Sequence, residues 1–123
     1  MDTNDLSGTW CSRYVYESSS DGKSHTDEHE VALELIDGSI TVKSNPHPDG
    51  SLFIINLTGD GNVFTGTWRE QASPTGIYKG AIFHGAIQLI LSDDGRKLTG
   101  CWVGFNSART RVKTGEWTLT KLK

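Results

Sequence analysis

In the stretch Gly59-Asp60-Gly61-Asn62-Val63-Phe64-Thr65-Gly66-Thr67-Trp68, a tight Asp-Gly turn leads into a strand-like run that ends in tryptophan. An Asp-Gly pair between two such runs is the strongest short-range signal for a β-hairpin. The Gly-x-Trp that follows places a residue without a side chain two positions before a large ring, on the same face of a strand. The stretch therefore predicts antiparallel strands that coil around aromatic side chains.

The same two features recur along the chain. Asp-Gly connections also occupy residues 36–39 and 92–95, and all 4 tryptophans follow a glycine by two positions. The other tryptophans stand in Ser7-Gly8-Thr9-Trp10, Thr99-Gly100-Cys101-Trp102 and Thr114-Gly115-Glu116-Trp117. This shared frame predicts that the rings point to one face, where they close and fill a narrow barrel.

The spacing of apolar residues predicts strands throughout. Apolar residues alternate or cluster in short runs, and no segment shows helical spacing. We expect strands at residues 8–17, 28–36, 39–46, 51–58, 62–72, 77–91, 97–105 and 114–121. The segment 77–91 is long for its neighbours, so a bend or bulge is expected near Gly85. The predicted fold is all-β: an eight-stranded antiparallel up-and-down barrel that forms a single domain over residues 1–123.

The connections between these segments differ at the two ends of the predicted barrel. Asp-Gly turns follow every second strand, whereas the other connections, at residues 18–27, 47–50, 73–76 and 106–113, include two long polar loops. In an up-and-down barrel, alternate connections lie at the same end. One end is therefore tied by tight hairpins, and the other carries the larger loops, where binding sites on rigid scaffolds usually lie.

Composition narrows the classes of function. The chain has 123 residues and a formal net charge of −3, which gives no global field that attracts a nucleic acid polymer. No run approaches the roughly 18 apolar residues that span a membrane, and the first residues lack the pattern of a secretory signal. We expect a cytoplasmic protein without a nucleic acid or membrane partner. Cys11 and Cys101 are expected to face outward from strands that are not neighbours and to stay reduced.

The motifs around the first and last tryptophans resemble those of the calycin superfamily. Leu6-Ser7-Gly8-Thr9-Trp10 is similar to the opening strand of avidins and to the Gly-x-Trp of lipocalins. Residues 113–120 are similar to the closing strands of these proteins. The resemblance implies the architecture of an eight-stranded barrel, and it implies no biotin site, because the avidin contact residues cannot be matched beyond the first strand.

A second resemblance spans most of the chain. Five segments are similar to an uncharacterised barrel domain that follows helix-turn-helix modules in some bacterial regulators: residues 12–16, 65–70, 73–80, 84–89 and 97–105. In length and architecture, the chain also resembles the ligand-sensing barrels of CBASS antiphage effectors, which bind cyclic dinucleotides. These resemblances imply a sensor whose output would come from an effector or regulator partner.

Strict alternation from the inward tryptophans assigns a face to each strand residue. It places Ile82 and His84 in the interior, fills the tight end with apolar side chains, and gathers polar and aromatic groups at the looped end. Such a graded interior suits an amphipathic planar molecule, such as a nucleotide or cyclic nucleotide. The candidate ligand-binding residues are Ser12, Tyr14, Tyr16, His29, Ser44, Trp68, Glu70, Tyr78, Asn106, Arg109, Arg111 and Trp117.

These groups also have purely structural interpretations. The tyrosines can be rim aromatics with solvated hydroxyls. An inward Glu70 needs a partner, which can be a protein Arg or Tyr as well as a ligand. His84 can be a hydrogen-bonded core histidine. The basic cluster of Arg109, Arg111 and Lys113 can clamp phosphate or carboxylate groups, or it can be a solvated loop.

No motif in the sequence points to catalysis. There is no nucleophile elbow, metal-bound water motif or phosphate-cradling glycine loop, so we do not expect an enzyme. His25, His29 and His47 fit no metal-ligand spacing, and neither a metal nor another cofactor is expected. The leading hypothesis is a sensor barrel that binds a small molecule. The alternative is a barrel with a filled interior that acts as a protein-interaction or oligomerisation module.

Overall fold

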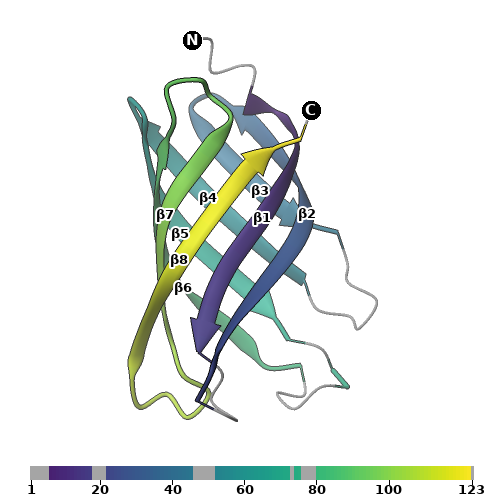
Figure 1. Ribbon diagram of the computed structural model, residues 1–123, viewed down its shortest axis with the longest axis vertical. Coiled ribbons are helices and arrows are strands. Elements are labelled where there is room, and N and C mark those ends of the chain that lie inside the picture. Colours follow the sequence, from purple (N-terminus) through teal and green to yellow (C-terminus); the bar gives the residue numbers. More distant parts are fainter. Residues whose placement is uncertain (1–5, 18–21, 46–51, 73, 76–79, 123) are drawn as a thin grey trace.

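The computed structural model describes residues 6–17, 22–45, 52–72, 74–75 and 80–122 (Figure 1). It contains eight strands: β1 (Gly8–Glu17), β2 (Ser24–Ile36), β3 (Ser39–Ser44), β4 (Leu52–Asp60), β5 (Val63–Gln71), β6 (Ile82–Leu91), β7 (Lys97–Phe105) and β8 (Val112–Lys121). Each strand pairs antiparallel with the next, and β8 pairs with β1. The predicted all-β fold, an eight-stranded closed up-and-down barrel, is confirmed.

The two ends of the barrel differ in their connections as predicted. The turns after β2, β4 and β6 lie at the end where β1 begins and β8 finishes, and the strand ends that these turns do not join lie at the other (Figure 1). Asp37 and Gly38 have φ angles of 51° and 78°, the left-handed pair that a two-residue hairpin turn requires. We call the end with the turns after β2, β4 and β6 the tight end, and the opposite end the looped end.

The barrel interior is a continuous apolar core. All four tryptophans are buried, Trp10 completely, which confirms that their rings share the inner face. Leucine, isoleucine and valine side chains from β2, β3, β4, β6, β7 and β8 fill the space around them; the most deeply buried include Leu33, Ile40, Val42, Ile55, Leu89, Leu98 and Leu119. The fold is therefore stabilised mainly by removal of this aliphatic and aromatic surface from water.

The predicted strand bounds hold best where Gly-x-Trp motifs fix them. The bounds of β1 and β7 are as predicted, whereas β2 begins at Ser24, four residues earlier than expected. No bulge occurs at Gly85, because β6 pairs one-to-one with β5 from Ile82 to Ile90. Instead, the pairing of β6 with β7 ends at Ala86, next to this glycine.

The interior assignment of β6 is wrong at two positions. Phe83, Ile87 and Leu89 point inward, whereas Ile82 and His84 lie on the exposed outer face. Without a bulge, the alternation set by Ile87 and Leu89 continues unbroken to the start of the strand. The prediction that His84 is a core histidine therefore fails.

Both cysteines lie in strands of the barrel wall. Cys101 is exposed and Cys11 half-buried, and both are free thiols, as expected. Burial raises the pKa of Cys11, and the carboxylates of Glu28 and Glu30 raise it further. Within the described segments, no helix has the length and apolar composition needed to cross a membrane.

Candidate functional site

Polar and aromatic side chains converge on the inner face of the barrel at its looped end. Tyr14 from β1, Asp27 from β2 and Glu70 from β5 meet there. The Tyr14 hydroxyl lies 2.6 Å from Glu70 Oε2 and 3.2 Å from Asp27 Oδ2. Since β5 is four strands away from β1 in either direction round the closed barrel, the Tyr14–Glu70 hydrogen bond crosses the interior.

A single hydroxyl hydrogen serves two carboxylates in this cluster. Burial raises the pKa of Tyr14, and the charges and hydrogen bonds of Glu70 and then Asp27 raise it further, so the phenol remains a neutral donor. The shorter contact assigns its proton to Glu70. Asp27 is then an acceptor for any donor that enters the looped end.

An aromatic floor lies beneath these polar groups. It is made of Tyr14, Phe53, Trp68, Trp102 and Trp117, all of which are buried. The Tyr14 and Trp117 rings are 4.7 Å apart, and Phe53 meets Trp117 edge-on at 5.4 Å. Trp68 lies 6.0 Å from Trp117 and 5.7 Å from Trp102. These separations are typical of favourable aromatic packing, so the floor is rigid and apolar.

Every indole N–H group in the barrel already has a protein acceptor. Trp117 donates to Ser12 Oγ at 2.7 Å, and Trp10 donates to the Leu6 carbonyl at 2.8 Å. Trp68 and Trp102 each donate to a backbone carbonyl at 3.0 Å. The tryptophans can therefore offer a ligand ring faces but no free donor. Ser12, fully buried, acts as the acceptor for Trp117.

Partly exposed aromatic and imidazole rings form the rim above the floor. Tyr16 stacks on His25 at 5.5 Å between centroids, and His29 lies nearly parallel to Tyr14 at 6.1 Å. His29 also meets Phe53 edge-on at 5.4 Å. These side chains are half-buried, so the rim is accessible to solvent while the floor is not.

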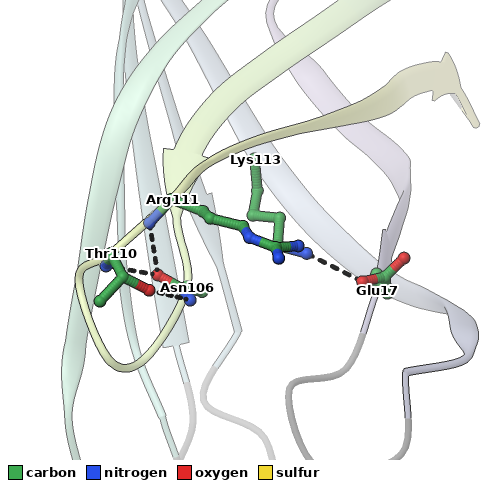
Figure 2. A network of polar contacts seen from close by, with 5 residues as sticks. All are labelled: Glu17, Asn106, Thr110, Arg111 and Lys113. Atoms are coloured by element: carbon green, nitrogen blue, oxygen red, sulfur yellow. Dashed lines mark hydrogen bonds and ion pairs between the residues drawn. The ribbon is translucent and has the colours of Figure 1, made fainter.

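Ser44 and Asn106 have structural partners. Ser44 Oγ accepts a hydrogen bond from the Phe53 backbone N–H at 2.8 Å and so joins β3 to β4. Asn106 Oδ1 accepts from the backbone N–H groups of Thr110 and Arg111, at 2.9 and 3.0 Å, and so holds the loop after β7 (Figure 2).

The two arginines predicted to bind a ligand lie in the same exposed loop. Arg109 places its guanidinium 5.1 Å from the centre of the Phe105 ring, on the outer face of the barrel. Arg111 is also exposed and lies near the Lys113–Glu17 ion pair (Figure 2). Both border the looped end rather than the aromatic floor. Tyr78, also predicted, lies outside the described residues.

The sequence-based prediction missed three members of the site. Asp27 and His25 share the inward parity of His29, but they precede the predicted start of their strand. Phe53 shares the parity of Ile55 and Leu57 on β4, a strand for which no interior residues had been assigned. In both places the alternation pattern could have found them. In the described part of the chain, no group of three or more His, Cys, Asp or Glu residues is arranged to hold a metal ion.

The arrangement combines flat apolar surface with hydrogen-bond acceptors, which suits a planar molecule that carries N–H donors at its edge. Comparison of the chain with protein-family models, with curated proteins and with solved structures gives no match.

Proposed function

We propose that this protein is a small-ligand-binding sensor barrel of calycin-like architecture, and that it binds an amphipathic planar molecule at its looped end. The observation that carries the proposal is the meeting of Tyr14, Asp27 and Glu70 above the aromatic floor. Sites for small organic molecules usually combine an apolar, aromatic lining with a few convergent polar groups. The proposed activity is binding, without a catalysed reaction.

The ligand chemistry that fits best is a nucleobase or related heteroaromatic ring, as part of a nucleotide or cyclic nucleotide. Carboxylates accept hydrogen bonds from amino and ring N–H groups, as acidic side chains do when they recognise bases. Asp27 and Glu70 would accept these hydrogen bonds while the ring stacks against Tyr16, His29 or Phe53. Arg109 and Arg111, in the loop that borders the same end, would attract the phosphate groups.

A binding screen tests this proposal. Nucleosides, cyclic mononucleotides and cyclic dinucleotides are added to the full chain, thermal stabilisation is recorded, and hits are titrated by calorimetry. We expect at least one compound to bind, and Glu70→Gln to weaken it about 10- to 100-fold, because a hydrogen bond to a charged group contributes about 1.5–3 kcal/mol.

A matched variant separates this effect from a general loss of charge. Glu116→Gln removes an exposed outward carboxylate on β8 and should leave the affinity unchanged. If no compound stabilises the protein, or if both variants bind equally well, the proposed site is wrong.

A second candidate function has its own supporting observation. Large apolar side chains are exposed on the outer faces of β6, β7 and β8: Ile90 at 52%, Val103 at 43% and Val112 at 77%. A barrel whose core is filled by its own side chains could use this wall to bind another protein or a second copy of itself. Light scattering during size-exclusion chromatography of the wild type and Val103→Asp would show an assembly that the substitution disrupts. A monomer in both cases would reject self-association.

A further inference from the structure

The β7–β8 hairpin is joined to its neighbours only along part of its length. The pairing of β8 with β1 ends at Trp117, and the pairing of β7 with β6 ends at Val103. Within the hairpin, pairing continues to Phe105 and Val112. Residues 104–116, here called the hairpin tip, therefore extend past the strand pairing on both sides. The divergence of β8 from β1 toward the looped end is visible in Figure 1.

On the β6 side, pairing ends where a tryptophan reaches across a glycine. Trp68, on β5, donates its indole N–H to the Val103 carbonyl on β7, at 3.0 Å. Gly85 lies between them on β6, and a Cβ atom there would be 1.7 Å from the Val103 oxygen and 3.0 Å from Trp68 Nε1. The glycine thus leaves room for a side chain to join two strands that are not neighbours.

On the β1 side, the same arrangement occurs again. Trp102, on β7, donates to the Val15 carbonyl on β1, at 3.0 Å, and Gly115 on β8 lies between them. A Cβ atom on Gly115 would be 2.2 Å from the Val15 oxygen and 2.7 Å from Trp102 Nε1. Each side of the hairpin is therefore anchored by one indole hydrogen bond near the point where backbone pairing stops.

Beyond these two anchors, side chains at the surface connect the tip to the rest of the barrel. Lys113 Nζ lies 2.8 Å from Glu17 Oε1 on β1, in an ion pair in which the Glu17 side chain is 52% exposed (Figure 2). On the other side, the Phe105 ring meets the His84 ring edge-on at 5.1 Å and the Phe83 ring at 5.7 Å, both on β6. An exposed ion pair and a pair of ring contacts are weak compared with a run of paired backbone groups.

The tip itself is internally well bonded. Asn106 accepts two backbone hydrogen bonds through Oδ1, and its amide nitrogen donates to Thr110 Oγ1 at 3.0 Å. The Asn106 backbone N–H donates to the Arg111 carbonyl, and Arg109 N–H donates to the Asn106 carbonyl. These contacts hold the loop together independently of the neighbouring strands (Figure 2).

We propose that the hairpin tip is a gate that swings away from β1 and β6 about the Trp68 and Trp102 anchors and so opens the looped end of the barrel. The motion breaks the Lys113–Glu17 ion pair and the ring contacts of Phe105, while the pairing within the hairpin is retained. The role of the gate, admission of a ligand, rests on the proposed function; the motion itself does not.

Distance measurements between spin labels test the motion in the free full-length chain. In a Cys11→Ser, Cys101→Ser background, one label is placed at Ser107→Cys in the tip and the other at Lys43→Cys on the opposite wall. The control pair is Thr120→Cys with Lys43→Cys, which reports on the part of β8 that pairs with both neighbours. All three label sites are exposed.

We expect the tip pair to show a second, longer distance that the control pair lacks. Glu17→Gln and Trp102→Phe should each raise the longer population at least twofold. Trp10→Phe removes an indole hydrogen bond at the tight end and should leave it unchanged. If Trp102→Phe does not fold, Glu17→Gln decides the result.

One narrow distance for the tip pair that neither variant changes would overturn the proposal. Because no ligand is present, this outcome would leave the binding proposal intact. Conversely, a moving tip with no ligand in the nucleotide screen would reject the proposed function and the gating role, while the motion itself would stand.

Discussion

Ser12 and Tyr14 occupy successive inward positions of β1, and each has a polar group that the barrel interior must satisfy. The Ser12 hydroxyl accepts the Trp117 N–H, and the Tyr14 hydroxyl donates to Glu70. Alternation along the strand predicted that these residues face inward, together with Glu70. It could not predict their partners, because Trp117 and Glu70 are 105 and 56 residues away in sequence.

Replacement of Ser12 by alanine should destabilise the protein by about 1–3 kcal/mol, since the buried Trp117 N–H would lose its acceptor. Urea unfolding followed by tryptophan fluorescence measures the change. Ser107→Ala, at an exposed loop position, is the matched control and should have almost no effect. Equal midpoints for the two variants would show that the Ser12 hydroxyl contributes nothing.

Glu17 should make the stability depend on pH. The hydrogen bond and the charge of Lys113 hold the pKa of Glu17 below its ordinary value, and Arg111 adds a smaller effect. The folded pKa is depressed, so this contribution is present above the unfolded pKa of about 4.3 and is lost as pH falls through the folded pKa.

NMR titration of the Glu17 carboxyl group measures this shift directly. Lys113→Met should move the pKa of Glu17 back toward its ordinary value, whereas Lys97→Met, on an exposed residue of β7, should not. An unchanged pKa of Glu17 in Lys113→Met would show that the ion pair does not hold the hairpin tip against β1.

At the scale of the elements, the repeated Gly-x-Trp motif explains both the successes and the failures of prediction. Motifs at the start of β1 and within β5, β7 and β8 fix which residues face inward. β6 has no tryptophan to mark its inner face. The bulge expected at Gly85 would have reversed the alternation, so Ile82 and His84 were assigned to the wrong face. The glycine serves a different purpose, because its missing side chain lets Trp68 reach β7.

Gly66→Ala tests how closely the strands approach one another. A Cβ atom at this position would lie 1.7 Å from the Asn56 backbone oxygen, so the wall must deform. We expect a loss of about 3 kcal/mol or more, at the upper end of overpacking costs. Gly38→Ala meets no atom within 4 Å and carries only the strain of its positive φ, about 1–2 kcal/mol. Comparable losses in urea unfolding would contradict a steric role for Gly66.

The whole molecule depends on the pairing of its first and last strands. Closure between β1 and β8 leaves the barrel without a free sheet edge along residues 10–14 and 117–121. The alternating turns predicted this closed topology well. The turns could not predict where β8 separates from β1 or β7 from β6, because these positions depend on how all eight strands coil around the barrel.

Removal of residues 112–123 should prevent stable folding, because β1 and β7 would each lose a partner. We expect an aggregating or unfolded chain by circular dichroism and light scattering. The control is a circular permutant in which a flexible linker joins residue 123 to residue 1 and new ends are opened between Asp93 and Asp94, in a tight turn. This permutant keeps all eight strands and should fold; a folded, monomeric truncation would show that closure is dispensable.

The positions of the start of β1 and the end of β8 have a practical consequence. The Leu122 N–H bonds the Thr9 carbonyl at 2.9 Å, so the last strand finishes beside the start of the first, at the opposite pole from the rim. A tag, a fluorescent reporter or a surface tether attached to either terminus would leave the rim facing open solution. The protein can therefore be immobilised on a biosensor chip for the nucleotide screen without the rim being obstructed.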